Sequence, residues 1–465
     1  MSRMIVALGG GNEVGRSCYD YGEFLIDAGL KLDEKRGGRI YTPTMPRGEK
    51  LFMALTHGHL DHVGYVVNVA REQPRMRIFA TEVTKELIEL QLYDSLKIAV
   101  EQREKNECRG LPAQPLMYEK EEIGVLLGRI EAVKDEGWFK PAPGYQMSFR
   151  GAGHIPGAAI VLVVTSYGSH IVHACDVSFD DQAFVKAARV PEDFLNPDLL
   201  VVESTHGALS APLPARKDAE ARLISVAKRV WARNGKLLIP QFATSGPQII
   251  DPLVKAGFPI VLDGAMRDCM WTYQNAQHWC EGDVNIESPM PIYLGKDEEN
   301  EGFQRSDSDF RRALMRWPGA CVVACTSGMM EAGLSVLYAE EWLADSNNAI
   351  IFTGYLAEES TGRKISQIQK GGAVTFHHAR LDRRTGKIEE WDVPVEINAE
   401  VYSIRLSGHS DSWKMVREFI EPLNPKCVVT VHGAPDAHIG MGEHIRNALP
   451  KAEIARALNN EPIEF

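Results

Sequence analysis

The chain has 465 residues, of which 44% are hydrophobic and 25% are charged, and this is the composition of a folded protein. Such a length is too great for one hydrophobic core and predicts two or three domains. The formal net charge of −12 argues against a protein that coats nucleic acid through a broad basic surface, but it allows a locally basic cleft.

The sequence gives no sign of export or of a membrane span. It contains no run of about 18 apolar residues, and the apolar stretch near the N-terminus is short. The eight cysteines are scattered without a Cys-x-x-Cys pair, so neither a disulfide framework nor a Cys-ligated zinc is indicated. We therefore expect a cytoplasmic protein that does not bind membranes.

Short apolar runs alternate with helix-like stretches along most of the chain, which is typical of α/β layers. Several of these runs end at a residue that can bind a metal or a proton, namely Asp27, His57, Asp176, Glu203 and His432. The carboxyl ends of strands form the ligand-binding edge of α/β sheets. These runs therefore indicate an active-site edge.

A middle segment continues the alternation without this set of ligand-bearing ends. It runs from about 208 to 395 and includes KLLIPQFA and PIVLDGA; the earlier pattern resumes at RLSGHSD, residues 405–411. We predict a smaller α/β domain at 208–395, inserted between two parts of a first domain at 1–207 and 396–465.

The sharpest motif is Thr-His-Gly-His-Leu-Asp-His at residues 56–62, directly after the run LFMAL. Side chains of an extended segment repeat every second residue, so His57 and His59 can reach one ion. Asp61 and His62 lie where a helix candidate begins, and they can reach a second point nearby. Imidazole and carboxylate together suit Zn²⁺ or Mn²⁺ and leave room for a bridging water. A lone histidine is usually structural, but this spacing at a strand end favours a metal site.

Further candidate ligands follow along the chain. His154 lies in the glycine-rich loop GAGHIPGAA, while Asp176 and His432 each end an apolar run. Taken singly, each has an ordinary structural interpretation as a loop histidine, a helix-capping aspartate or a turn histidine. Their common location favours a shared site, in which Asp176 could bridge two cations.

These residues resemble the motifs of a known family. Asp27, the 56–62 motif, His154 and Asp176 are similar, in this order, to motifs one to four of the metallo-β-lactamase superfamily. Glu203, His409 and His432 resemble motifs A, B and C of the β-CASP nucleases, and SGMMEAGLS (327–335) is also typical of that group. The resemblance covers nearly the whole chain. It implies an α/β fold, a metallo-β-lactamase αββα sandwich with an inserted α/β β-CASP domain.

Motif C separates branches of this family. Its RNA-directed members have histidine there, whereas the Artemis-like DNA nucleases have valine. His432 therefore implies an RNA substrate, as for the endonuclease subunit of the pre-mRNA 3′-end cleavage complex, its prokaryotic homologues and RNase J. Single-stranded RNA is the expected partner, and the oligomeric state stays open, with a homodimer as one option.

The resemblance further implies a two-metal site, with two Zn²⁺ ions expected and Mn²⁺ as the alternative. We assign the ligands in two groups, His57, His59 and His154 for one ion and Asp61, His62 and His432 for the other, with Asp176 bridging. A metal-activated hydroxide would then attack phosphorus.

The remaining motif residues receive roles around these ions. His409 is expected to be the general acid toward the leaving oxygen, held by Glu203, whose negative charge would raise its pKa. Asp27 would orient the ligand loop. The expected catalytic residues are thus Asp61, Glu203 and His409.

The chain departs from the family pattern at two places. Relatives commonly have a Gly-Arg-Ala-Gln-Glu-like stretch after Phe-Ala, whereas FATSGPQII (242–250) lacks the Arg and the Glu; His206 stands where relatives often have Tyr. The first difference could remove a phosphate contact.

Other functions stay open at this point. One is a small-molecule metallo-hydrolase of esters, thioesters or lactams, which has no use for the insertion or for His409 with Glu203. Another is a single-stranded DNA nuclease. A non-catalytic RNA-binding subunit would predict lost ligands, and the sequence retains them all.

Overall fold

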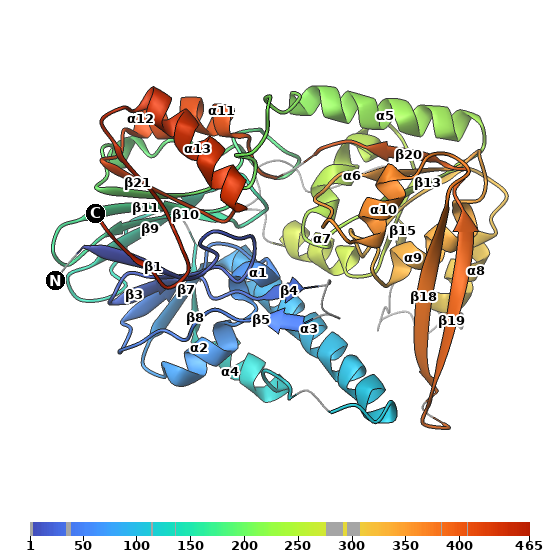
Figure 1. The fold of residues 1–465 in the computed structure, drawn as a ribbon, viewed down its shortest axis with the longest axis horizontal. Coiled ribbons are helices and arrows are strands. Elements are labelled where there is room, and N and C mark those ends of the chain that lie inside the picture. Colours follow the sequence, from blue (N-terminus) through green and yellow to red (C-terminus); the bar gives the residue numbers. More distant parts are fainter. Residues whose placement is uncertain are drawn as a thin grey trace.

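The computed structural model describes residues 3–33, 39–112, 115–134, 136–275, 292–294, 307–382, 384–406 and 408–465. The chain forms two lobes, and both chain ends lie in the same lobe, at the left of Figure 1. Among the described residues, no helix has the length and hydropathy needed to cross a membrane.

The left lobe is built on two sheets. The first has the order β23-β1-β2-β3-β6-β7-β8 and the second β22-β21-β12-β11-β10-β9. The strands of the first are β1 (Met4–Gly9), β2 (Cys18–Asp20), β3 (Phe24–Ile26), β6 (Phe52–Ala54), β7 (Arg77–Thr81), β8 (Ile130–Val133) and β23 (Pro462–Glu464). Those of the second are β9 (Gln146–Gly151), β10 (Ala159–Val164), β11 (His170–Ala174), β12 (Leu199–Glu203), β21 (Cys427–Val431) and β22 (Glu453–Arg456).

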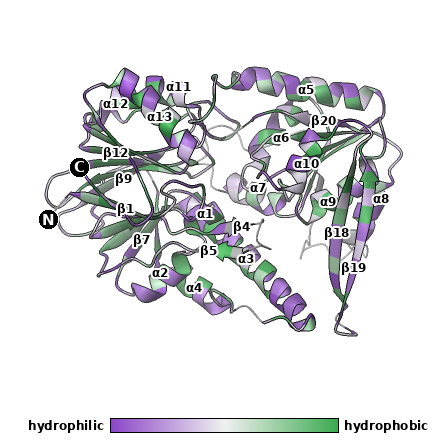
Figure 2. Cartoon of the chain, in the orientation of Figure 1, coloured by the Kyte–Doolittle hydropathy of each residue, from purple (hydrophilic) through white to green (hydrophobic). Residues whose placement is uncertain are grey.

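The two sheets pack face to face through a core of aromatic and branched side chains. The Phe24 and Phe52 rings stack with their centroids 4.9 Å apart, and the Tyr145 ring meets Phe52 edge-on at 5.3 Å. Burial of each such ring stabilises the sandwich by a few kcal/mol, roughly 25 cal/mol per Å² of apolar surface. Figure 2 shows the hydrophobic residues along these strands, in contrast to the hydrophilic outer end of α3.

Helices cover the outer face of each sheet. Those on the first are α1 (Leu60–Val63), α2 (Val66–Glu72), α3 (Glu82–Cys108) and α4 (Lys120–Arg129). Those on the second are α11 (Ser412–Met415), a π-helical turn at Val416–Ile420, α12 (Glu421–Leu423) and α13 (Pro435–Ala448). A 3₁₀ turn (Glu192–Phe194) and the strand pair β4 (Lys31–Asp33) and β5 (Arg39–Tyr41) complete this lobe. Its layers are helix, sheet, sheet and helix, which confirms the expected αββα sandwich.

The right lobe is a parallel sheet of order β15-β14-β16-β13-β17-β20. Its strands are β13 (Lys236–Pro240), β14 (Ile260–Asp263), β15 (Ile292–Leu294), β16 (Cys321–Cys325), β17 (Ala349–Phe352) and β20 (Glu400–Ser403). Its helices are α5 (Arg216–Ala232), α6 (Gly246–Lys255), α7 (Met266–Asn275), α8 (Asp307–Met315), α9 (Leu334–Trp342) and α10 (Thr361–Gln367), and β18 (Ala373–Asp382) pairs with β19 (Lys387–Glu396) as a hairpin. Continuous apolar runs form β13, β14, β16 and β17, because helices bury both faces of a parallel sheet.

The end of the inserted segment differs from the expected residue 395. Strand β20 pairs in parallel with β17, with Ala349 opposite Glu400 and Phe352 opposite Ser403. The insertion therefore continues at least to Ser403. The short polar strand EVYS gave no sequence signal of membership in this sheet, because its pattern lacks the apolar run of its neighbours.

A buried histidine lies in the core between the sheets of the left lobe. His173 is 0% exposed, and its Nδ1 accepts a hydrogen bond from the Tyr21 hydroxyl at 2.8 Å, since burial keeps that hydroxyl protonated. Its Nε2 has no hydrogen-bond partner among the described residues. Burial, with the charge of His62 as a second cause, lowers the pKa of His173 to about 3.

This histidine makes the stability of the fold depend on pH. The folded state keeps His173 neutral, whereas an unfolded histidine takes up a proton below pH ~6.5. Stability is therefore lost as the pH falls from about 6.5 toward the folded pKa of about 3. Between pH 7 and 5, the unfolding free energy of the wild type should fall by about 2 kcal/mol more than that of His173→Gln, as measured by urea unfolding. His170→Gln, which alters an exposed histidine of the same strand, should follow the wild type, and equal pH slopes for all three proteins would contradict the argument.

Candidate metal centre

The candidate ligands lie where strands of both sheets end. Asp27 directly follows β3, and His57 follows the parallel strand β6. Asp176, Glu203 and His432 lie at the corresponding ends of β11, β12 and β21, which are also parallel to one another. The carboxyl ends of the two parallel groups thus open onto one edge of the sandwich, as the ends of the apolar runs predicted.

One group of side chains surrounds a first point beside Asp176. Each member offers a ligand atom within 4.8 Å of the others, and the members are His57, His59, His154 and Asp176. The Nδ1 of His59 lies 3.1 Å from Nε2 of His57 and 3.2 Å from Nε2 of His154. The Oδ2 of Asp176 is 3.5 Å and 3.7 Å from the same two Nε2 atoms. Three imidazole nitrogens and a carboxylate oxygen converge here, which is a donor set that suits zinc.

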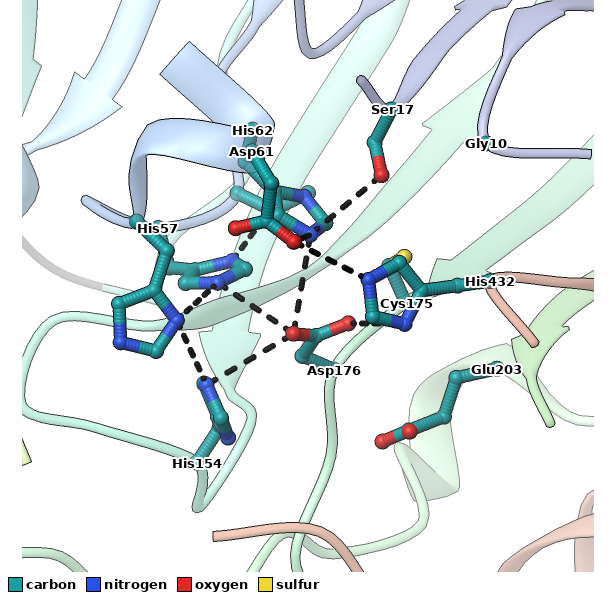
Figure 3. Close-up of polar contacts among 12 residues, drawn as sticks. Gly10, Ser17, His57, Asp61, His62, His154, Cys175, Asp176, Glu203 and His432 are labelled. Atoms are coloured by element: carbon teal, nitrogen blue, oxygen red, sulfur yellow. Dashed lines mark hydrogen bonds and ion pairs between the residues drawn. The ribbon is translucent and has the colours of Figure 1, made fainter. Parts of the chain in front are cut away.

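A second group lies on the other side of the same carboxylate and comprises Asp61, His62 and His432. The Oδ2 of Asp61 is 3.3 Å from Nε2 of His432 and 3.9 Å from Nε2 of His62. Asp176 faces this group as well, with Oδ2 3.6 Å from His62 Nε2 and Oδ1 3.5 Å from His432 Nδ1. Figure 3 shows the four rings of His57, His62, His154 and His432 around the Asp176 carboxylate. The Asp176 carboxylate therefore lies beside both groups.

The chemistry of these residues fits a bound cation. The Oδ1 of Asp176 is buried and accepts no hydrogen bond from the described residues, although a buried carboxylate oxygen needs a compensating partner. Burial, followed by neighbouring histidine charges, lowers the pKa of His57 and of His154 well below the ordinary value. Burial likewise lowers the pKa of His59 to about 4. These rings are therefore neutral at physiological pH, which is the form that binds metal.

The second group has a different charge balance. Burial opposes protonation of His62, but the charges of Asp176, Asp61 and Asp27 outweigh it and raise its pKa to about 10. His432 has a raised pKa because Asp176 and Asp61 likewise outweigh its burial. The same carboxylate charges attract a divalent cation, which would compete with these protons.

Asp27 and Thr56 fix the direction of two of the histidines. The Asp27 carboxylate is fully buried; its Oδ2 lies 2.7 Å from His62 Nδ1 and accepts a hydrogen bond from the Thr56 hydroxyl at 2.7 Å. The Thr56 amide donates to Asp27 Oδ1 at 2.8 Å, and the Thr56 hydroxyl lies 3.0 Å from His57 Nδ1. Nδ1 of His57 and Nδ1 of His62 each have a hydrogen-bond partner, so Nε2 of each ring points toward the ligand cluster. Thr56 was not a predicted site residue, although its place just before His57 was a signal.

A glycine of the SGHSD segment holds the third histidine. The carbonyl of Gly408 accepts a hydrogen bond from His154 Nδ1 at 2.8 Å. A side chain at this position would place Cβ 2.8 Å from that nitrogen, so only glycine allows the approach. Sequence reasoning missed this contact, because it joins residues far apart in the chain through a backbone atom.

His409 lies beside the same cluster but is held by a different partner. Its Nδ1 lies 2.7 Å from Oε2 of Glu203, which is fully buried and also accepts from the Val177 amide at 2.7 Å through Oε1. The other ring nitrogen, Nε2, is 4.0 Å from Asp176 Oδ2, farther than the Nε2 atoms of His57, His62 and His154, which lie 3.5 to 3.7 Å from that oxygen. Burial opposes protonation of His409, but the charges of Glu203 and Asp176 raise its pKa to about 9. The neighbouring carboxylates therefore favour the protonated form of His409 beside the cluster.

Thr244 of the inserted lobe reaches the cluster. The Thr244 hydroxyl lies 2.8 Å from His59 Nε2, which directs Nδ1 of that ring toward the ligand cluster. Thr244 is 1% exposed, and its carbonyl accepts a hydrogen bond from the Tyr273 hydroxyl of α7 at 2.6 Å. This threonine belongs to 242–250, the stretch that lacks the arginine and the glutamate of the family pattern. No sequence signal identified it.

Comparison with known proteins agrees with this architecture. Residues 248–365 match the family described as Beta-Casp domain. Residues 394–455 match the family described as Zn-dependent metallo-hydrolase RNA specificity domain. The two matches cover much of the right lobe and the returning segment of the left lobe, which carries His409 and His432.

Relatives extend the likeness along nearly the whole chain. Transcription termination factor FttA of Methanocaldococcus jannaschii is 27% identical over 96% of this chain and 69% of its own length. RNase aCSPSF2 of Saccharolobus solfataricus is 25% identical over 97% of this chain and 83% of its length. Cleavage and polyadenylation specificity factor subunit 3 of Dictyostelium discoideum is 27% identical over 92% of this chain and 53% of its length. The matched domains, the ligand-bearing edge of the sandwich and these relatives together show that the chain is similar to the β-CASP family of metallo-β-lactamase-fold metallo-hydrolases.

Proposed function

We propose that this protein is a metal-dependent ribonuclease that hydrolyses phosphodiester bonds of single-stranded RNA. The observation that carries the proposal is the pairing of His409 with Glu203 at the edge of the histidine and aspartate cluster. A proton donor is useful where the leaving group is a poor one, such as a ribose oxygen. Support comes also from the relatives named RNase and from the matched domain described by RNA specificity.

The ligand assignment is part of the proposal. His57, His59 and His154 would hold one cation and Asp61, His62 and His432 the other, with Asp176 between them. Two such ions supply a water of lowered pKa as the nucleophile and neutralise charge that develops on the phosphate. The excess of imidazole over carboxylate favours Zn²⁺ over Mn²⁺.

His409 would give its proton to the leaving oxygen. Glu203 occupies Nδ1 at 2.7 Å, so the Nε2–H faces the side of the pocket where Asp176 lies. The buried charge of Glu203 stabilises the protonated ring, and its second oxygen is held by the Val177 amide. Glu203 therefore positions the acid, and its charge raises the pKa of His409 more than the charges of Asp176 and Asp61 do.

The proposed substrate can be tested directly. Purified protein should cut labelled single-stranded RNA, and a metal chelator should abolish this cleavage, because the cluster supplies no other nucleophile. Single-stranded DNA of the same sequence and a chromogenic ester should be poor substrates.

Efficient ester hydrolysis without RNA cleavage would favour the small-molecule hydrolase, and preference for DNA would favour the DNA nuclease. Mapping products from RNA labelled at each end would also distinguish internal cleavage from cleavage that starts at an end.

The role of His409 predicts a difference between two substrates. His409→Ala should retain its metal and lower RNA cleavage by about 10²- to 10⁴-fold, the usual contribution of general acid catalysis. Hydrolysis of a nitrophenyl phosphodiester should fall much less, because a nitrophenolate leaves without a proton. His377→Ala, which alters an exposed histidine of the β18–β19 hairpin, is the control. Loss of metal from His409→Ala, or equal loss on both substrates, would show that His409 is a ligand or a structural residue.

A further inference from the structure

The segment 404–406 connects the sheet of the right lobe with the cluster of the left lobe. The chain leaves β20 in the right lobe and crosses to α11 in the left lobe through this region (Figure 1). The amides of Ile404 and Leu406 donate to the carbonyls of Phe352 and Thr353, at 2.9 and 3.1 Å. The segment is therefore extended, and it lies along the carboxyl end of β17, the edge where an α/β sheet presents its ligands.

Buried and exposed side chains alternate along this segment, and the exposed one is Arg405. Ile404 and Leu406 are 2% and 3% exposed, whereas Arg405 between them is exposed. Within the described part of the chain, the Arg405 guanidinium makes no hydrogen bond and no ion pair with a carboxylate. A hydrated, unpaired guanidinium retains all five of its N–H donors for an incoming ligand.

The charge of Arg405 acts on the pocket of the proposed acid. The His206 ring lies edge-on to the His409 ring, with centroids 6.0 Å apart. Burial, then the charge of His409, then the charge of Arg405 lower the pKa of His206 to about 3. Arg405 is thus close enough to His206 to influence it electrostatically, and Gly408, three residues after it, contacts His154.

The segment of the inserted lobe that contacts His59 contributes no cation of its own. The stretch 242–250, which places Thr244 on His59, contains no lysine or arginine. Yet a protein of net charge −12 needs cations in its cleft to bind a phosphate backbone. Arginine suits this task because its planar fork can donate two parallel hydrogen bonds to one phosphate.

From these observations we infer that Arg405 is the substrate-binding arginine of the cleft and contacts a phosphate of the RNA next to the scissile one. This inference rests on the proposed ribonuclease function. Arg405, on the segment that joins the lobes, would thus make a phosphate contact for which 242–250 has no basic side chain. Arg405 acts in binding, whereas His409 and the metal ligands act in the chemical step.

The test compares Arg405→Gln with Arg316→Gln. Arg316 is also exposed and without an ion pair in the described residues, but it precedes β16 and so lies at the amino edge of the same parallel sheet. Both variants change the net charge equally. RNA affinity by fluorescence anisotropy, and kcat and KM for cleavage, would be measured over a series of salt concentrations.

Arg405→Gln should weaken RNA binding and raise KM by about tenfold, with kcat little changed, because one charge-assisted contact is lost. The slope of log affinity against log salt should become shallower by about 0.7, the value for one phosphate of a single strand. Arg405→Lys should recover part of the affinity, and Arg316→Gln should match the wild type. A nitrophenyl phosphodiester lacks a neighbouring phosphate, so its hydrolysis by Arg405→Gln should stay unchanged.

Three results would overturn the assignment: unchanged affinity and salt slope in Arg405→Gln, equal weakening in Arg316→Gln, or parallel loss of nitrophenyl phosphodiester hydrolysis. Failure of the wild type to cut RNA would refute the proposed function instead. Even then, the RNA affinities of Arg405→Gln and Arg316→Gln, compared with that of the wild type, test whether Arg405 binds RNA.

Discussion

The buried charge of Asp176 is the interaction on which the arrangement of the cluster depends. This carboxylate is 5% exposed and lies within 4 Å of the Nε2 atoms of His57, His62 and His154. A carboxylate withdrawn from water costs several kcal/mol unless cationic or hydrogen-bonding partners surround it. One of its oxygens accepts no hydrogen bond from the described residues. The fold thus gathers histidines from both sheets around a charge that a divalent cation would compensate.

Both lobes contribute side chains to the surroundings of Asp176. The sandwich of the left lobe holds the ligand histidines in fixed orientations. Asp27 contacts Nδ1 of His62, and the Gly408 carbonyl contacts Nδ1 of His154. The right lobe adds Thr244 on His59 and, by our inference, Arg405 on the RNA. Rigid ligands and a cation at the crossing between lobes are what a two-metal nuclease needs, because phosphodiester hydrolysis depends on positioning and on charge neutralisation.

Much of this arrangement could be predicted from sequence, for local reasons. The 56–62 motif follows a strand, so its spacing alone predicts which side chains converge, and the order of the motifs predicts the αββα sandwich with its insertion. The structure and the comparisons confirm the fold and the resemblance to this family. The approach of His409 to Glu203 at 2.7 Å also agrees with the expected pairing. The individual metal and catalytic roles stay predictions.

The contacts that sequence reasoning missed are those that depend on tertiary approach. Gly408 acts through a backbone carbonyl, and Thr244 touches His59 only because the lobes close on each other. Strand β20 joins its sheet by pairing with β17 and not by its own apolar pattern, so the boundary at 395 was placed too early. Position in space, and not residue type, decides such contacts.

The most direct test of this account is the metal content of Asp176→Asn. The wild type should hold about two equivalents of a transition metal, mostly zinc, by elemental analysis after dialysis. Removing the shared charge should weaken both subsites together and lower the content well below one equivalent, while Asp392→Asn on the exposed β18–β19 hairpin should retain both. A folded Asp176→Asn protein that still holds two equivalents would show that Asp176 does not organise the site.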